Sequence, residues 1–273
     1  MTLRIGWFAT ARGQTSGKLL AGALAAIKEG RLDAEVAVVF CNRDPGEDAN
    51  ADAFHEQVRA AGIPLVTLSS REFRRAAGGE VARKGEPLPE WRREYDREVM
   101  RSLAPHEFEI GVLAGYMLIF CEEAAAKWDL LNLHPAAPGG PAGMWQDVIW
   151  ELIAHGADRA GVMIHLATPE LDEGPVVTYC TYPIRDGATD DLWRDATTDA
   201  PAEKGEELPL FQEIRRRGVL REVPLVIETL RAFADGCLRV RDKQAVNAAG
   251  TVIEAYDLSE EIERITTASA DRP

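Results

Sequence analysis

Short apolar runs alternate with helix-like stretches along this chain, and this alternation limits the fold more than any other feature of the sequence. Buried strands are expected at residues 3–9, 35–41, 63–68, 108–114, 130–133, 160–167 and 175–183. Helices are expected in the stretch that ends at Lys28 and at residues 51–61, 90–103, 121–127 and 144–155. Strands that alternate with helices are joined by right-handed crossovers, so we predict an α/β fold with a mainly parallel sheet.

Other segments depart from the alternation. Residues 76–89 are rich in glycine, proline and mixed charge, which predicts an exposed loop, and residues 184–209 are expected to form a long polar excursion. Two helices are expected after it, at residues 210–217 and 223–235, with Gly236 as a helix stop. The last thirty residues are predicted to form one or two short strands and a frayed tail.

The length and composition fit one large domain with an appendage. The chain has 273 residues, of which 46% are hydrophobic. We expect an α/β domain at residues 1–241 and a C-terminal extension at residues 242–273. Apolar runs are too short for a membrane span and no secretory leader opens the chain, so a cytoplasmic protein without a membrane partner is expected.

The charge and the cysteines exclude several kinds of partner. A formal net charge of −14 argues against nucleic acid, because phosphate binding needs a basic face. Arginines cluster at residues 71–75, 92–97 and 215–221, but interleaved acids at helical spacing make these clusters typical of solvated helix faces. The four cysteines have no metal-ligand spacing, so buried free thiols and no metal are expected.

Polar residues concentrate where the strand at residues 130–133 ends. Asn132 and His134 are two residues apart and so point to the same side of an extended chain. A proline- and glycine-rich loop follows, and an acidic turn containing Glu170 and Asp172 lies downstream. An amide for an oxyanion, an imidazole and a carboxylate together suit acyl transfer. On spacing alone, acyl transfer and ordinary loop hydrogen bonding both stay open.

Ordered motifs resemble the folate-dependent formyltransferase family, of which glycinamide ribonucleotide formyltransferase is a member. The motifs are Asn132-Leu-His-Pro135, Gly161-Val-Met-Ile-His165, Glu170-Leu-Asp-Glu-Gly-Pro175, Tyr95-Asp-Arg-Glu98, Val112-Leu-Ala-Gly-Tyr-Met117 and Pro224-Leu-Val226. The resemblance implies a Rossmann-like, mostly parallel open sheet with helices on both faces. It also implies 10-formyltetrahydrofolate as the formyl donor and Asn132, His134 and Asp172 as the catalytic residues, with no metal.

The same resemblance implies where the folate lies. Two segments would hold the pteridine through backbone groups and apolar contacts, and they contain Tyr116, Met117, Leu118 and Ile119 in the first and Ala167, Thr168 and Glu170 in the second. The family often has arginine where this chain has Leu118, which is a departure from its pattern. For His165, a place in the cleft and a place in the core both stay open.

The acceptor is expected to be a small-molecule amine. The turn after the first strand contains Arg12, Gly13, Gln14, Thr15 and Ser16. It matches the family's phosphate-holding turn only in outline, so an anion site and a plain strand-to-helix turn both stay open. The long segments 76–89 and 184–209 favour a sugar, an amino-acid-type amine or another specialised acceptor over glycinamide ribonucleotide. A homodimer is compatible with the sequence.

Other functions fit less well. A formyltetrahydrofolate hydrolase would use the same residues, but such enzymes carry a domain before the catalytic one. A formyltransferase acting on methionyl-tRNA is disfavoured because no basic domain follows. A non-catalytic folate- or nucleotide-binding module would not require Asn132, His134 and Asp172. No Gly-x-Gly-x-x-Gly follows the first strand, which disfavours an NAD-dependent enzyme.

Overall fold

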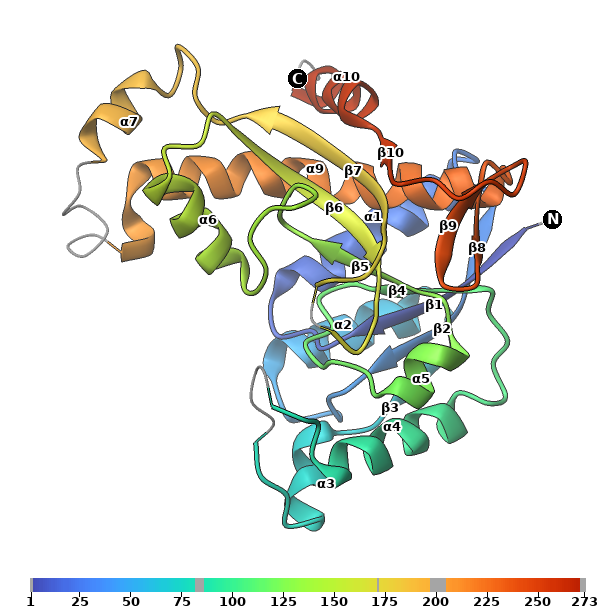
Figure 1. The fold of residues 1–273 in the computed structure, drawn as a ribbon. Coiled ribbons are helices and arrows are strands. Elements are labelled where there is room, and N and C mark those ends of the chain that lie inside the picture. The colour runs from blue at the N-terminus through green and yellow to red at the C-terminus, as the bar shows by residue number, and fades with distance from the viewer. Residues whose placement is uncertain (1, 82–85, 171, 197–204, 271–273) are drawn as a thin grey trace.

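The expected alternation produces one mixed sheet in this computed structural model, which describes residues 2–81, 86–170, 172–196 and 205–270. Within these residues, eight strands line up in the order β10-β7-β6-β5-β4-β1-β2-β3 (Figure 1). Their bounds are β1 Leu3–Ala9, β2 Ala34–Cys41, β3 Leu65–Thr67, β4 Ile110–Leu113, β5 Leu130–His134, β6 Arg159–Leu166, β7 Val176–Pro183 and β10 Tyr256–Asp257. A separate hairpin pairs β8, Leu238–Arg241, with β9, Gln244–Asn247.

Most neighbouring strands in the large sheet are parallel. The exception is β6, which runs antiparallel to both β5 and β7. Strands β1, β2, β3, β4 and β5 are parallel to one another, so their carboxyl ends meet at one edge. This arrangement confirms the predicted Rossmann-like, mostly parallel open sheet. Ligands of such sheets bind beyond that edge.

Helices cover both faces of the sheet, as predicted. They are α1 Gln14–Lys28, α2 Ala49–Ala60, α3 Ser70–Ala76, α4 Glu90–Ser102, α5 Glu122–Lys127, α6 Trp145–Ala154, α7 Asp190–Asp195, α9 Pro209–Ala234, α10 Ser259–Ala270 and the 3-10 helix η1 Gly205–Glu207. Among the described residues, no helix combines the length and the apolar character needed to cross a membrane.

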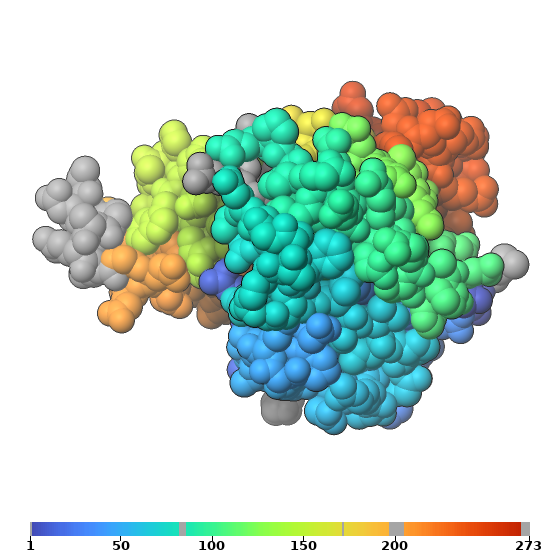
Figure 2. Space-filling model, turned by 90° about the horizontal axis from the view of Figure 1, so that it is seen from below, coloured from blue at the N-terminus to red at the C-terminus, as the bar shows by residue number. Residues whose placement is uncertain are grey.

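The two faces of β1 explain this layering. Successive side chains of a strand point to opposite faces, and the neighbours Trp7 and Phe8 are both fully buried. Trp7 belongs to the core shared with α1, α2 and α9, whereas Phe8 belongs to an aromatic core shared with α4 and α5. Figure 1 shows α9 running along the sheet beside β6 and β7. Seen from below, the blue-to-green segment from α2 to α4 covers much of the surface, and α6 and the start of α9 project beside it (Figure 2).

The two long connections match their predictions in part. Residues 77–81 and 86–89 contain no helix or strand, as expected for the loop, and residues 82–85 lie outside the described residues. The segment 184–209 is not wholly irregular, because it contains α7 and η1, while residues 197–204 lie outside the described residues. The indole N–H of Trp193 in α7 donates to the carbonyl of Ile184 at 2.8 Å, which ties this helix to the end of β7.

The prediction of two helices at residues 210–217 and 223–235 is wrong, because α9 is continuous over 26 residues with Pro224 inside it. A proline within a helix removes one hydrogen bond and costs about 3 kcal/mol. Burial on both sides of the proline offsets this cost. The buried apolar residues are Leu210, Phe211 and Ile214 before it, and Leu225, Val226 and Leu230 after it. Tertiary packing therefore overrides the local stop signal.

The expected frayed tail is also corrected, since residues 259–270 form α10. Strand β10 adds to the sheet beside β7, and Ile262 of α10 is fully buried. Arg221 of α9 donates to Glu263 of α10 at 2.6 Å. Residues 256–270 therefore pack against the α/β domain rather than trailing from it.

The contact between α1 and α9 generates a stability prediction. A Cβ on Gly22 would lie 2.3 Å from Cγ1 of Val223, whereas a Cβ on Gly187 would meet no atom within 4 Å. Helix propensity alone makes Gly-to-Ala stabilising by about 1 kcal/mol, but overpacking costs about 1–3 kcal/mol. Gly22→Ala should therefore lower the free energy of unfolding in a urea titration, and Gly187→Ala should not. Adding Val223→Ala to Gly22→Ala should restore part of the loss; no restoration would show that the close packing is not the cause.

Candidate active site at the carboxyl end of β5

The pairing of β5 with β6 brings the first two polar side chains together. Asn132 on β5 stands directly opposite His165 on β6 in the antiparallel register. His134 lies two residues further along β5 and therefore points to the same side as Asn132. The loop between β6 and β7 returns Asp172 to the same place, so three sequence-predicted catalytic residues and His165 form one cluster.

Asn132 donates through its amide nitrogen to two members of the cluster. Its Nδ2 lies 2.9 Å from Nε2 of His165 and 3.3 Å from Oδ1 of Asp172. Turning the amide around would place its oxygen against the Asp172 carboxylate, so the orientation with nitrogen towards Asp172 is favoured. His134 and His165 are buried, whereas Asn132 and Asp172 are partly buried, although the side chain of Asp172 is only 6% exposed.

His165 has one protonation pattern that suits its neighbours. Its Nδ1 lies 3.0 Å from the carbonyl oxygen of Leu166, which can only accept, so Nδ1 carries the proton. Its Nε2 then offers a lone pair to the Asn132 amide. The ring is 2% exposed. His165 is thus buried, as the core alternative predicts, and it contacts Asn132.

His134 is held by the loop that follows it. Its Nε2 lies 2.8 Å from the carbonyl oxygen of Pro141, so Nε2 donates. Its Nδ1 faces Oδ2 of Asp172 at 3.6 Å, where a proton on Nδ1 would be attracted by the carboxylate. The proline-rich loop can fold back this far because Gly161 of β6 has no side chain. A Cβ there would lie 2.7–2.9 Å from atoms of Ala137.

Asp172 occupies a strained position. Its φ is 57°, in the left-handed region that L-residues rarely adopt. Its Oδ2 accepts from the backbone N–H of Gly143 at 3.1 Å. Burial alone would raise the pKa of the Asp172 carboxyl, but the nearby His165 and His134 and the Gly143 N–H outweigh burial and hold that pKa below its ordinary value. The carboxylate is therefore kept ionised beside the two imidazoles.

The turn that carries Asp172 is closed by a backbone contact. A Cβ on Gly174 would lie 1.7 Å from the carbonyl oxygen of Leu166, so only glycine fits there. Ala167 is partly buried and its N–H donates to Leu130 of β5 at 2.8 Å. The Thr168 hydroxyl donates to the carbonyl of Glu170 at 3.0 Å, and Glu170 itself is exposed. Leu171 lies outside the described residues.

The other segment expected to hold folate follows β4. The Tyr116 ring is buried and stacks on Phe120 with centroids 4.9 Å apart, so this side chain belongs to the aromatic core. Met117 is 46% exposed, while Leu118 and Ile119 are partly buried. Among the described residues, the backbone groups of Leu118 make no hydrogen bond within the protein. The segment thus presents an apolar side chain and a free peptide.

The turn expected to hold an anion lies at the same sheet edge, after β1. Gly13 caps α1 without a side-chain hydrogen bond and the first turn contains no acid, which leaves helix N–H groups available. Arg12 and Gln14 are exposed and Thr15 is partly buried. The Ser16 hydroxyl, by contrast, donates to the carbonyl of Ala114 at 2.7 Å. Ser16 therefore fixes the turn against the segment after β4.

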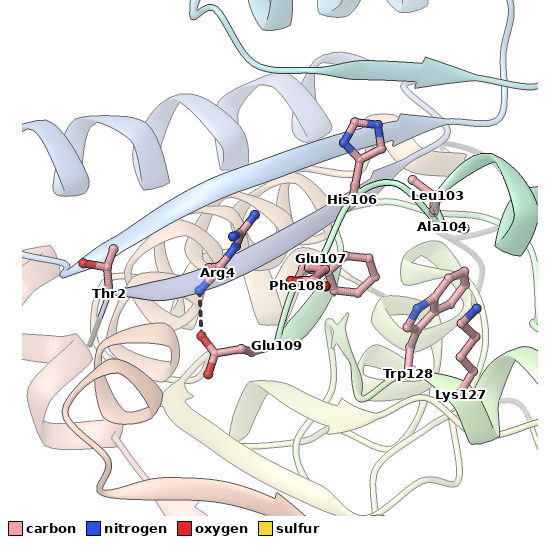
Figure 3. Close-up of a pocket in the computed structure, with 10 residues that line it drawn as sticks. All are labelled: Thr2, Arg4, Leu103, Ala104, His106, Glu107, Phe108, Glu109, Lys127 and Trp128. Carbon is pink, nitrogen blue, oxygen red and sulfur yellow. Dashed lines mark hydrogen bonds between the residues drawn. The ribbon is translucent and has the colours of Figure 1, made fainter.

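A cavity of about 650 Å³ lies elsewhere, at the amino ends of β1 and β4 (Figure 3). Phe108 and Trp128 form its aromatic part, with Lys127 beside the indole. Arg4 and Glu109 at its margin are exposed, and the Arg4 N–H donates to the Glu109 carboxylate at 3.1 Å. None of the Asn132 cluster lines it. Size alone does not make a catalytic site, so we assign the site to the cluster, where polar groups converge.

Metal ligation receives no support from the described residues. Within them, no group of three or more histidine, cysteine, aspartate and glutamate side chains could hold a metal ion. The two histidines and one carboxylate of the cluster are instead occupied by hydrogen bonds to Asn132, Pro141 and Gly143.

Sequence reasoning did not identify the backbone groups of the site. The Pro141 carbonyl and the Gly143 N–H orient His134 and Asp172, and Thr10 holds the segment after β4 by accepting from the Met117 N–H at 2.9 Å. The proline- and glycine-rich composition of residues 135–143 signalled a stiff loop. It carried no signal of which backbone atoms would face the imidazole.

Comparison with known proteins agrees with this geometry. Residues 10–204 match the formyl transferase family, and the chain therefore belongs to that family. Phosphoribosylglycinamide formyltransferase of Escherichia coli (strain K12) is 28% identical over 179 residues, which are 64% of this chain and 73% of that protein.

Two solved structures share the fold. The phosphoribosylglycinamide formyltransferase of Coxiella burnetii has a TM-score of 0.66 and 19% identity, and the match covers 94% of this chain and 99% of the other. A formyltetrahydrofolate deformylase of Pseudomonas syringae pv. tomato has a TM-score of 0.63 and 19% identity, with 90% and 66% coverage. The fold is thus common to transferring and hydrolysing proteins, and the protein described here is a formyltransferase-family enzyme.

The lowered pKa of Asp172 predicts a pH-dependent contribution to stability. The ionised carboxylate stabilises the fold above its unfolded pKa of about 3.9, and this contribution is lost as the pH falls through the lower folded-state pKa. The difference in free energy of unfolding between the parent protein and Asp172→Asn should therefore be larger at about pH 6 than at about pH 3. Urea titrations at several pH values would measure it, with Glu170→Gln on the same turn as a control. A difference that does not change with pH would contradict the prediction.

Proposed function

We propose that this enzyme transfers a formyl group from 10-formyltetrahydrofolate to a small-molecule amine by direct attack. The observation that carries the proposal is the cluster of Asn132, His134, Asp172 and His165, in which one amide contacts a buried carboxylate that faces two imidazoles. Membership of the formyl transferase family supports the formyl group as the unit transferred.

The chemistry follows from the donor and acceptor atoms of the cluster. The neutral amine attacks the formyl carbon, the carbonyl oxygen becomes an oxyanion, and one amine proton must leave. Asn132 donates to the oxyanion by exchanging its long 3.3 Å contact with Asp172 for the stronger new bond. His134 stabilises the developing charge and supplies the proton to the folate nitrogen as the carbon–nitrogen bond breaks. Asp172 accepts the amine proton directly or through water and returns it to His134.

Placement of the donor rests on the two segments that flank the cluster. The turn that begins at Ala167 carries Asp172. In the segment at residues 116–119, the backbone groups of Leu118 make no hydrogen bond to the described residues, and the side chain of Met117 is exposed. A pteridine presents hydrogen-bonding edges and flat apolar faces, which suit these two features. Tyr116 would contribute through its backbone, because its ring is buried.

The acceptor would approach from the turn after β1. Arg12 and the free N–H groups at the start of α1 suit a phosphate or carboxylate on the acceptor. We propose a specialised sugar or amino-acid-type amine ahead of glycinamide ribonucleotide, because the turn lacks the family's serine-asparagine pair and the long segment before α9 contains the additional helices α7 and η1.

Substitutions in the cluster should strongly lower the rate of transfer without unfolding the protein. Asn132→Ala removes an oxyanion donor and should lower kcat by about 10²–10³. His134→Ala removes the proton-transfer group and should lower kcat by about 10²–10⁴. The measurement is release of tetrahydrofolate from 10-formyltetrahydrofolate in the presence of a panel of amines, with mass spectrometry of the formylated product. His155→Ala, an exposed histidine at the end of α6, is the matched control and should retain full activity.

The outcomes of this assay separate the alternatives. Release that depends on one amine supports transfer, and equal release with every amine or none indicates hydrolysis. Folate binding without release from the parent protein indicates a non-catalytic binding module. Undiminished turnover in His134→Ala would show that the cluster is not catalytic.

The anion site is tested by comparing amines that differ only in a phosphate or carboxylate. Loss of a charge-assisted hydrogen bond weakens binding about tenfold or more. Arg12→Ala should therefore raise KM for the anionic member of each pair by about this factor, and leave the neutral member unchanged. Lys18→Ala, an exposed cation further along α1, is the control. An equal effect on both members would remove Arg12 from the site.

A further inference from the structure

A buried ion pair lies on α4, away from the catalytic cluster. Nη1 of Arg92 donates to Oδ1 of Asp96 at 3.1 Å, and the two side chains are 1% and 0% exposed. The guanidinium also lies over the rings of Trp91 and Tyr95, at 5.4 and 5.2 Å. Charged residues are rarely buried this deeply in a surface helix unless both partners make further bonds.

Both partners use their remaining atoms on one target, the segment that follows β4. Nη2 of Arg92 donates to the carbonyl of Ile119 at 2.7 Å. Oδ2 of Asp96 accepts from the N–H of Cys121 at 2.7 Å. The pair therefore grips two backbone groups, two residues apart, in a part of the chain that has no helix or strand of its own.

The opposite end of the same segment is anchored separately. The N–H of Met117 donates to the Thr10 hydroxyl at 2.9 Å, and the N–H of Thr10 donates to Gly115 at 3.2 Å. Leu118 lies between the two anchors, and its backbone N–H and carbonyl make no hydrogen bond to the described residues. The segment is thus a short bridge, fixed at Met117 on one side and at Ile119 and Cys121 on the other.

Stability alone does not explain an ion pair at this place. Breaking a buried pair by removing one partner is costly, but replacing both partners by apolar residues of similar size is often neutral or stabilising. The ion pair differs from an apolar replacement in one respect. The Arg92 guanidinium donates to the carbonyl of Ile119, and the Asp96 carboxylate accepts from the N–H of Cys121. Its distinct contribution is the position of the backbone between residues 117 and 121.

We propose that Arg92 and Asp96 are positioning residues for the folate donor, which hold the Leu118 peptide where the pteridine binds. This inference rests on the proposed function, because it assumes that the donor occupies the segment at residues 116–119. Neither side chain touches the donor. The ion pair sets the distance between the Leu118 peptide and the Asn132 cluster, so loss of the pair weakens donor binding more than it weakens the fold.

The test compares folate binding with stability in two variants. Arg92→Lys keeps the positive charge beside Asp96 but lacks the planar fork that also reaches Ile119. Arg92→Met with Asp96→Leu removes both charges together and avoids an unpaired buried ion. Each should weaken binding of tetrahydrofolate, measured by calorimetry under nitrogen, by about tenfold, the loss expected when a hydrogen bond to the ligand is misplaced. Melting temperatures should stay within a few degrees of the parent.

A matched control removes an ion pair elsewhere. Arg221→Met with Glu263→Leu breaks the 2.6 Å contact between α9 and α10 and should leave tetrahydrofolate binding unchanged. Hydrogen exchange of the peptide that covers residues 116–121, followed by mass spectrometry, adds a direct reading. Exchange there should accelerate in both α4 variants and not in the control, because Cys121 loses its acceptor or that acceptor moves.

Two failures are distinguishable. If the parent protein does not bind tetrahydrofolate, the proposed donor is wrong. If the parent binds it and Arg92→Lys binds equally well, with the exchange of residues 116–121 unchanged, the positioning role is wrong. Weaker binding accompanied by an equal loss in the α9–α10 control would also overturn it, because the effect would then be one of general stability.

Discussion

Antiparallel pairing of β6 with β5 is the constraint on which the site depends. It sets His165 opposite Asn132, and it ends β6 beside Leu130 and Leu131, so the loop that carries Asp172 begins next to β5. A slip of one residue would move every side chain of β6 to the other face of the sheet. Asn132 would then lose the acceptor that orients its amide, and Asp172 would no longer return to His134. The cluster therefore depends on the mixed character of the sheet.

Fixed acceptors then determine the protons of the cluster. Carbonyl oxygens of Leu166 and Pro141 can only accept, so each imidazole must donate through the nitrogen that faces its carbonyl. Nε2 of His165 then has a lone pair that accepts from the Asn132 amide. The other nitrogen of His134, Nδ1, faces the Asp172 carboxylate. The amide is oriented before any ligand arrives, and an amide already in place stabilises an oxyanion without reorganisation. In this arrangement the backbone of Asp172 adopts a left-handed conformation, which is strained.

Patterns with a strong local cause were predictable, and interactions between distant segments were not. Alternating apolar runs located the strands around Trp7 and Phe8, and the spacing of Asn132 and His134 placed both on one side of a strand. The helix break expected near Pro224 does not occur, because burial of apolar residues along α9 outweighs the cost of a single proline. His165 was ambiguous for a related reason: a histidine in an apolar strand is indistinguishable from a core residue until its cross-strand neighbour is known. The sequence predicts a solvated helix face for the arginine cluster at residues 92–97, and this prediction is wrong for Arg92, because its side chain is buried.

The two regions that we propose for the donor and the acceptor are joined by hydrogen bonds. Thr10 accepts from Met117 and Ser16 donates to Ala114, so the turn after β1 and the segment after β4 are fixed to each other by residues at the two ends of that turn. Between these ends, Arg12 and Gln14 are exposed and make no contact that the folate side requires. Their identities can therefore change without moving the segment after β4, whereas a change at Thr10 would remove one of its anchors. The departures of this chain from the family's phosphate-holding turn fall in that exposed middle part, so under the proposed function they would alter the acceptor and leave the formyl donor in place.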